Sequence, residues 1–140
     1  MIPIKSERDL RVMRKSCEIA ATVLDKISKL AVAGVSTWDL NEAAKRLMDQ
    51  YHCRSASYKY KCGSLKYPCH VCISVNDQVI HGIASKEVIL KDSDIVSIDC
   101  ATIYQGFVGD NTRTVYIGEP TPEVRKLVEA TAESLRLGID

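Results

Sequence analysis

The stretch from residue 95 to residue 114, IVSIDCATIYQGFVGDNTRT, constrains the fold more than any other part of the chain. Two runs rich in β-branched and aromatic residues flank a turn, which we place at residues 103–106 with Tyr104 and Gln105 at its tip. The pattern therefore predicts a β-hairpin. Two aspartates, Asp99 and Asp110, fall inside this apolar hairpin, one on each strand.

The position of this turn places Asp99 directly opposite Asp110, with their Cβ atoms ~4.5–5.5 Å apart. A three-residue turn would shift the register by one residue but would still keep both carboxylates close. Two like charges in an apolar sheet need a shared proton or a cation, and carboxylate oxygens suit divalent ions. The residues therefore predict a metal site. The alternative is that Asp99 faces solvent and Asp110 belongs to an ordinary turn.

Three other segments have the pattern of amphipathic helices. The first starts at an N-cap, Ser6, with Asp9 three residues later, and the second starts at Ser36 or Thr37. The third has Thr121 as its N-cap and Pro122 at its first position. The stripes that we expect to be buried are Leu10, Met13, Cys17, Ala20, Leu24, Ile27 and Leu30 in the first helix, Leu40, Ala44, Leu47 and Tyr51 in the second, and Val124, Leu127, Val128 and Leu135 in the third.

Short strands are predicted at residues 71–75 and 78–80, joined by a turn at Asn76 and Asp77, with further strands at residues 87–104 and 107–118. The chain is therefore expected to be a single α+β domain, residues 1–140, with helices packed on an antiparallel sheet. The last helix still brings apolar residues up to Ile139, and no element follows to cover them. We therefore expect the chain to end partway through a larger fold.

His81 lies in the sequence VIHGI, after a predicted strand and before Gly82, which permits a close approach of the backbone. A lone histidine is more often a packed or surface residue than a catalyst. Of the six cysteines, Cys17 and Cys100 are predicted to be buried thiols in a reducing compartment. Two alternatives are a structural zinc on Cys62, Cys69 and Cys72 with His70, and a redox pair of Cys69 and Cys72.

Charge and hydropathy limit the partners that the sequence suggests. The 19 basic and 18 acidic residues leave a net charge of +1, which predicts no specific nucleic acid and no membrane as a partner. Lys59, Lys61 and Lys66 are expected to lie in a solvated loop. Because the N-terminus has no apolar signal region and no later run is long enough to span a membrane, we expect a cytoplasmic protein.

Several motifs together resemble the type I methionine aminopeptidases. They are YPCHVCISVNDQVIHGI, LKDSDIVSIDCATIYQGFVGDNTRT and AVAGVSTWDLNEAA, and the similarity runs from about Ile4 to the end of the chain. The resemblance implies a pita-bread fold, in which two pseudo-symmetric α+β halves enclose a dinuclear metal site. Residues 1–140 would form the N-terminal half of that catalytic domain.

The resemblance also implies roles for individual residues. Asp99 and Asp110 match metal ligands for two divalent ions, which can be Co, Mn, Fe or Zn. His81 matches a catalytic histidine that contacts the substrate near the scissile amide, and Tyr67 and Cys72 match residues that line the methionine pocket. The remaining ligands of the family belong to the second half, so we expect the 140-residue chain alone to be inactive.

The implied activity is metal-dependent removal of the N-terminal methionine from nascent proteins, with association with the ribosome as a further implication. The alternative is a non-catalytic pita-bread module that binds peptides or partner proteins. The chain departs from the family pattern in two places. The loop at residues 55–68 is longer than the usual connection, and Cys69 with His70 has no counterpart there.

Overall fold

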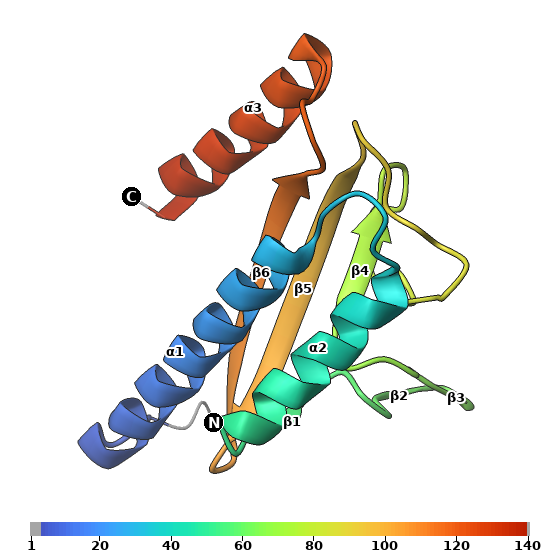
Figure 1. Cartoon of the computed structure of the whole chain (residues 1–140). Helices are drawn as coiled ribbons and strands as arrows, with labels where there is room; N and C mark the ends of the chain where they lie inside the picture. Colours follow the sequence, from blue (N-terminus) through green and yellow to red (C-terminus); the bar gives the residue numbers. More distant parts are fainter. Residues whose placement is uncertain (1–3, 140) are drawn as a thin grey trace.

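The computed structural model of the chain describes residues 4–139, apart from the side chain of Cys62. The elements are the helices α1 (Glu7–Leu30), α2 (Thr37–Gln50) and α3 (Pro122–Ile139), and the strands β1 (Arg54–Ser55), β2 (Lys61–Cys62), β3 (Leu65–Lys66), β4 (Cys72–Val75), β5 (Ile95–Tyr104) and β6 (Phe107–Tyr116). Helices α1 and α2 lie side by side on one face of the main sheet (Figure 1). The predicted α+β class is confirmed.

Strand β5 is the centre of the main sheet. It pairs with β6 along one edge. Along the opposite edge it pairs with β4 in its first half and with β1 near its end. All of these pairings are antiparallel. Strands β2 and β3 form a separate two-stranded hairpin that extends beyond the β4 side of the sheet (Figure 1).

Helix α1 starts as predicted, with a capping box between Ser6 and Asp9. Its buried stripe differs from the prediction in that Ser16 is buried while Cys17 and Leu30 are exposed. Ser16 donates a hydrogen bond to the Phe107 carbonyl at 2.8 Å, because the helix here approaches the sheet too closely for a larger side chain. The prediction of a buried Cys17 was therefore wrong.

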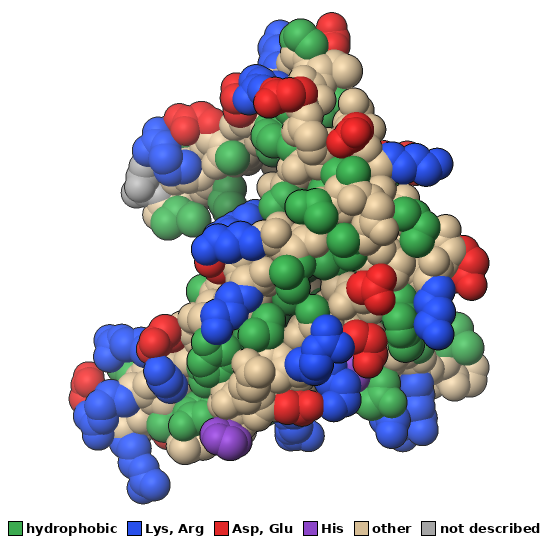
Figure 2. All heavy atoms as spheres, in the orientation of Figure 1, with side chains coloured by type: hydrophobic (Ala, Val, Ile, Leu, Met, Phe, Trp, Pro, Cys, Tyr) green, Lys and Arg blue, Asp and Glu red, His purple; other side chains and the backbone are tan. Residues whose placement is uncertain are grey.

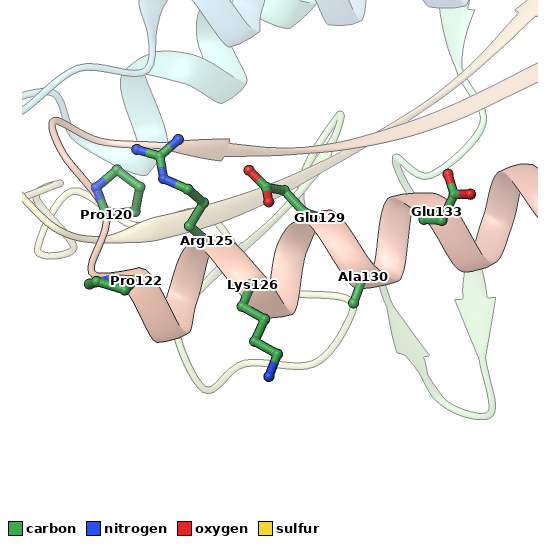
Figure 3. Close-up of a pocket in the computed structure, with 7 residues that line it drawn as sticks. All are labelled: Pro120, Pro122, Arg125, Lys126, Glu129, Ala130 and Glu133. Atoms are coloured by element: carbon green, nitrogen blue, oxygen red, sulfur yellow. The ribbon is translucent and has the colours of Figure 1, made fainter.

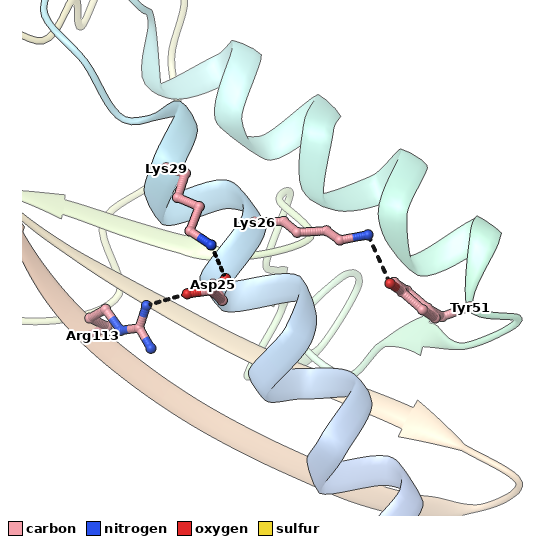
Figure 4. Close-up of polar contacts among 5 residues, drawn as sticks. All are labelled: Asp25, Lys26, Lys29, Tyr51 and Arg113. Carbon is pink, nitrogen blue, oxygen red and sulfur yellow. Dashed lines mark hydrogen bonds and ion pairs between the residues drawn. The ribbon is translucent and has the colours of Figure 1, made fainter.

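Helix α2 is capped by Ser36, which forms a second capping box with Asp39. Leu40 and Ala44 are buried as predicted, together with Met48, whereas Leu47 and Tyr51 lie at the edge of the core. The ring of Tyr51 is held at this edge, since its hydroxyl accepts a hydrogen bond of 2.8 Å from Lys26 of α1 (Figure 4).

The same helix α1 is also tied to strand β6. The Asp25 carboxylate contacts Arg113 of β6 at 3.1 Å and Lys29 at 2.6 Å, as Figure 4 shows. These groups are largely exposed, so each pair contributes little to stability. The main stabilisation comes from the apolar core between helices and sheet.

The two faces of the sheet have different neighbours. Val96, Ile98 and Cys100 of β5 are buried under α1 and α2 in the apolar core. Because side chains alternate along a strand, Ser97, Asp99 and Ala101 point to the other face. Those residues are only half-buried. This second face, which we call the open face, is where the predicted aspartates lie.

One predicted strand is wrong, and another, predicted over residues 87–104, forms only over residues 95–104. Residues 78–80 form no strand, and Val79 and Ile80 are 85% and 68% exposed. The chain turns away at Asn76, which has φ +53° and whose side chain bonds Asp94 and the Ile95 amide. Residues 87–94 are also irregular apart from a single bridge between Ser36 and Ile89.

Helix α3 begins at Pro122 after Thr121, as predicted. None of its described residues is buried, and the helix stands away from α1 and the sheet in Figures 1 and 2. Leu127, Leu135 and Ile139 are exposed. Within residues 4–139, no helix combines the length and apolar character that crossing a membrane would require.

Candidate functional site

The register of the β5–β6 hairpin corrects the predicted turn. The turn residues are Gln105 and Gly106, with φ +49° and +87°, and Tyr104 pairs with Phe107. A two-residue hairpin turn of this type needs positive φ at both central positions, which suits a glycine at the second one. Asp99 consequently pairs with Thr112, and Asp110 pairs with Ala101. The prediction that the two aspartates face each other directly was wrong.

The two aspartates are nevertheless neighbours on the open face. They are displaced by one diagonal step, since Asp110 lies two residues from the partner of Asp99, and diagonal side chains remain within reach of each other. The pKa of Asp99 is raised by burial and by the negative charge of Asp110. The Thr112 hydroxyl, which donates to Asp99, partly opposes this increase.

Strand β4 brings Cys72 to the same face, because Cys72 pairs with Asp99 across the sheet. Cys72 is 6% exposed, and its thiol contacts the Tyr67 hydroxyl. That hydroxyl donates to the Gly82 carbonyl at 2.7 Å. Burial, followed by the contact with Cys72, raises the pKa of Tyr67, so the phenol is neutral at physiological pH. Tyr67 and Cys72 thus form an apolar wall beside Asp99.

The backbone around Gly82 is bonded to strand β4 and so fixes the chain at His81, which is exposed. The Ile73 amide donates to the Gly82 carbonyl, and the Gly82 amide donates to the Ser74 hydroxyl, both at 3.0 Å. A Cβ at Gly82 would overlap the Ile73 carbonyl, so only glycine fits there. His81 itself has φ +57°, a conformation that non-glycine residues rarely adopt and that is common at functional sites. A charge on His81 would lower the pKa of Asp99, as the smallest of the influences on that carboxyl.

The structure therefore brings together all of the residues predicted for the site, namely Tyr67, Cys72, His81, Asp99 and Asp110. Two neighbours of the site were not predicted from the sequence. Thr112 is a hydrogen-bond partner of Asp99, and Ser57 is one of Cys72. Thr112 lies two residues after Asp110 on the same strand. Because side chains two residues apart on a strand share a face, the sequence could have predicted that Thr112 lies beside the aspartates.

The donor set at this place fits a divalent cation. Two carboxylates held close together on a half-buried sheet face repel each other unless a proton or a cation lies between them. Their oxygens are the ligands that hard and borderline divalent ions prefer. Across residues 4–139, however, no three His, Cys, Asp or Glu side chains are grouped to hold a metal ion. Asp99 and Asp110 thus supply only part of a coordination sphere.

The cysteine alternatives find little support among the described residues. Cys69 is buried with its Sγ 3.9 Å from the Ala84 carbonyl, and its pKa is raised by burial. The His70 ring stacks on Tyr58, with 4.4 Å between ring centroids. Cys62 belongs to the zinc alternative, and its side chain lies outside the described part of the chain, so that alternative stays a prediction.

A separate hollow lies along α3 (Figure 3). It is lined by Pro120, Pro122, Arg125, Lys126, Glu129, Ala130 and Glu133. None of the predicted site residues is among them. Its basic and acidic side chains project from a solvent-exposed helix in Figure 3, in contrast to the half-buried Asp99.

Comparison with known families gives one family match. The profile of metallopeptidase family M24 matches residues 11–140, which include every residue of the candidate site. Among individual proteins, the chain is 40% identical to the methionine aminopeptidase of Aquifex aeolicus over 99% of its own length and 55% of that protein. It is 38% identical to the methionine aminopeptidase of Clostridium acetobutylicum over 100% of its length and 54% of that protein.

Solved structures agree with this result. The crystal structure of methionine aminopeptidase from Rickettsia prowazekii superimposes with a TM-score of 0.93 at 32% identity, over 100% of this chain and 54% of that one. The expected pita-bread fold is confirmed by this likeness for the part that the chain covers. The chain spans about half the length of the curated relatives that it matches.

Proposed function

The chain belongs to metallopeptidase family M24, and we propose that it is the N-terminal part of a methionine aminopeptidase, which removes the first methionine from newly made proteins. The observation that carries this proposal is the cluster on the open face. Two neighbouring carboxylates, a histidine in a strained conformation and an apolar wall with a sulfur atom lie together there. An aminopeptidase acting on methionine needs each of these parts.

The wall formed by Tyr67 and Cys72 provides the recognition element for the substrate. Both side chains are neutral at physiological pH, since burial raises the pKa of each. A neutral, apolar surface with a polarizable sulfur suits the thioether of methionine, which also favours contacts with aromatic rings. The hydrogen bond from Tyr67 to the Gly82 carbonyl holds the ring in place before the substrate arrives.

Asp99 and Asp110 are the residues that would hold divalent metal, and we propose two ions, with Co, Mn, Fe and Zn as candidates. When bound, such ions supply an activated water and polarise the substrate carbonyl. Thr112 orients the Asp99 carboxylate through its hydroxyl. The other metal ligands are expected from residues that follow this segment in the longer relatives.

His81 is proposed to contact the amide of the first peptide bond. Its backbone is fixed by the bonds around Gly82, so the imidazole is positioned by the sheet rather than by a flexible loop. From that position an imidazole N–H can donate to the scissile amide as charge develops on it. The proposed setting is the cytoplasm, close to ribosomes, where newly made N-termini appear.

A chimera tests this activity. Residues 1–140 would replace the matching 55% of the Aquifex aeolicus methionine aminopeptidase, to which they are 40% identical. With added Mn²⁺ or Co²⁺, we expect the chimera to release methionine from a Met-Ala-Ser peptide. Asp110→Asn should lower kcat/KM by about a hundredfold or more, since loss of a ligand removes the metal's contribution to catalysis. A soluble, folded chimera that releases no methionine would refute the proposal.

Metal binding by the 140-residue chain separates this proposal from a non-catalytic binding module with the same fold. Isothermal titration calorimetry with Mn²⁺ should show binding that Asp110→Asn abolishes. The matched control is Asp77→Asn, which removes one carboxylate from an exposed turn. If wild type and Asp110→Asn bind Mn²⁺ equally, the two aspartates are not ligands, and the binding module becomes the better explanation.

A further inference from the structure

The segment from residue 54 to residue 66, which contains strands β1, β2 and β3, concentrates positive charge. We call it the basic hairpin. Its charged residues are Arg54, Lys59, Lys61 and Lys66, and it contains no acidic residue. Since the whole chain has a net charge of only +1, the rest of the chain carries an excess of acidic residues. The near-neutral net charge of the whole chain therefore hides an uneven distribution of charge along the sequence.

The charges of the basic hairpin are not neutralised within the described structure. Lys61 and Lys66 are paired directly across the two strands, and both are exposed. Like charges in this arrangement destabilise a hairpin. No ion pair joins Arg54, Lys59, Lys61 or Lys66 to a carboxylate of the described residues. An anionic partner would relieve this repulsion.

Aromatic rings lie among these charges. Tyr60 is 68% exposed, and Tyr58 is 40% exposed. Tyr58 stacks on His70 at an interplanar angle of 19°, and the Lys59 ammonium lies 5.1 Å from the Tyr58 ring centroid. Burial and the nearby Lys45 lower the pKa of His70, so its ring is neutral at physiological pH. The result is a flat stacked surface with a cation at its side.

A hollow at the base of the basic hairpin continues this surface. Its lining includes the basic Arg54 and Lys59 and the rings of Tyr58 and His70, together with Lys45, which is paired with the acidic lining residue Asp49 at 2.6 Å. Figure 2 shows Lys and Arg side chains around the β2–β3 hairpin, at the lower right of the molecule. Cations that follow a groove and rings that stack are the two features that proteins use to bind single-stranded nucleic acids.

We propose that the basic hairpin is a docking surface for single-stranded RNA. Lys59, Lys61 and Lys66 would contact phosphates, while the exposed ring of Tyr60 would stack on a base. An acidic peptide would use the charges but would leave the exposed face of Tyr60 without a partner. The choice of RNA rests on the proposed function, because newly made protein chains emerge next to RNA. Such binding would not depend on the base sequence of the RNA. It is therefore compatible with the expectation of no specific nucleic acid partner, which was drawn from the net charge alone.

The basic hairpin is connected rigidly to the methionine pocket. The Lys59 amide donates to the Tyr67 carbonyl at 2.8 Å, and the Tyr67 amide donates to the Tyr60 carbonyl at 2.9 Å. These bonds extend the β2–β3 pairing up to Tyr67, whose hydroxyl lies in the candidate site. RNA bound to the basic hairpin would therefore hold the pocket at a fixed place relative to that RNA.

The test is fluorescence anisotropy of a labelled 12-nucleotide oligouridylate, titrated with the 140-residue chain in EDTA at 50 and 200 mM salt. The wild type should bind, with an affinity that falls as salt rises. Lys61→Gln/Lys66→Gln should weaken binding about tenfold at 50 mM salt and reduce the log–log salt slope by about 1.4, or about 0.7 per lost phosphate contact. Tyr60→Ala should cost about fivefold or more in affinity.

The matched control is Lys86→Gln/Lys91→Gln, which removes two exposed lysines outside the basic hairpin and should leave RNA affinity unchanged. The proposal is overturned by no binding of the wild type at 50 mM salt, or by an equal loss in the control. Displacement of the RNA by polyglutamate of equal charge would assign the surface to acidic peptides instead. Tighter binding of the matching DNA oligomer or of duplex RNA would also overturn it.

This experiment is independent of the aminopeptidase proposal. It uses no metal and no substrate peptide, so failure to bind RNA would leave the activity of the chimera unaffected. Conversely, an inactive chimera would not alter the measured affinity of the basic hairpin for RNA.

Discussion

The Thr112 hydroxyl opposes the raised pKa of Asp99, the more buried of the two candidate ligands. Burial and the charge of Asp110 both favour the protonated form of Asp99, and the Thr112 hydroxyl favours the carboxylate by donating to it. Because a metal ligand must be deprotonated, this hydroxyl prepares Asp99 for binding a cation. The contact is set by the strand register, in which Thr112 pairs with Asp99.

Thr112→Val should raise the pKa of Asp99 further above its usual value, because the carboxylate loses its hydrogen-bond donor. The measurement is an NMR titration of the Asp99 carboxyl carbon in EDTA. Thr114→Val is the matched control, since the Thr114 hydroxyl bonds Ser97 and not an aspartate. An unchanged pKa in Thr112→Val would show that the hydroxyl does not stabilise the carboxylate.

The sign of the effect on stability follows from linkage. A carboxyl with a raised pKa in the folded state holds its proton more tightly when folded than when unfolded. The free energy of unfolding therefore falls as pH rises from the unfolded value near 3.8 through the folded pKa. Thr112→Val should make the free energy of unfolding fall more steeply as pH rises. The effect is moderate, because Asp99 is partly exposed and its charge is screened by water.

Among the elements, α1 and β6 approach each other closely at Gly109. Gly109 of β6 faces the turn of α1 that contains Ser16, and a Cβ at this position would overlap the Ser16 carbonyl. Gly109 immediately precedes Asp110. The contact between Gly109 and α1, which packs the helix on the sheet, therefore also fixes the position of the neighbouring candidate ligand, Asp110.

Gly109→Ala should lower the free energy of unfolding by about 1–3 kcal/mol, because backbone atoms of α1 and β6 must separate to admit the methyl group. Urea denaturation followed by circular dichroism measures this change. Gly138→Ala is the control, since a Cβ there meets no atom within 4 Å and the variant should be within about 0.5 kcal/mol of wild type. Equal stability of Gly109→Ala and wild type would contradict the observed packing.

At the scale of the whole molecule, the described chain consists of a packed body and a helix that stands apart from it. The apolar core joins α1, α2 and the sheet, whereas α3 contributes no buried residue. Leu127, Leu135 and Ile139 are exposed on α3. The relatives are almost twice as long as this chain. In a fold of that length, the additional residues could pack on the exposed apolar side chains of α3.

A chain that ends at residue 120 should consequently melt within a few degrees of the full segment, since removal of α3 exposes no core residue. Differential scanning calorimetry gives both melting temperatures. Ile27→Ala serves as the comparison, because Ile27 is 0% exposed and its truncation should cost about 2–5 kcal/mol. A loss on truncation as large as that of Ile27→Ala would mean that α3 stabilises the body.

Local patterns in the sequence were sufficient to predict the elements with local causes. Helix α1 follows from the capping box of Ser6 and Asp9, and α3 from Thr121 and Pro122, because caps depend on neighbouring residues alone. The central hairpin follows from its β-branched runs. Resemblance to a known family then identified the residues that the structure brings together on the open face.

Other features depend on contacts between residues distant in sequence, and only the tertiary structure decided them. The burial of Ser16 instead of Cys17 depends on Gly109, more than ninety residues later. The diagonal placement of Asp99 and Asp110 depends on positive φ at Gln105 and Gly106, which shifted the expected turn by one residue. The sequence thus determined which residues are candidates for the site. The packing of helix on sheet and the register of two strands determined how they are arranged, because no local pattern records how closely distant backbones approach.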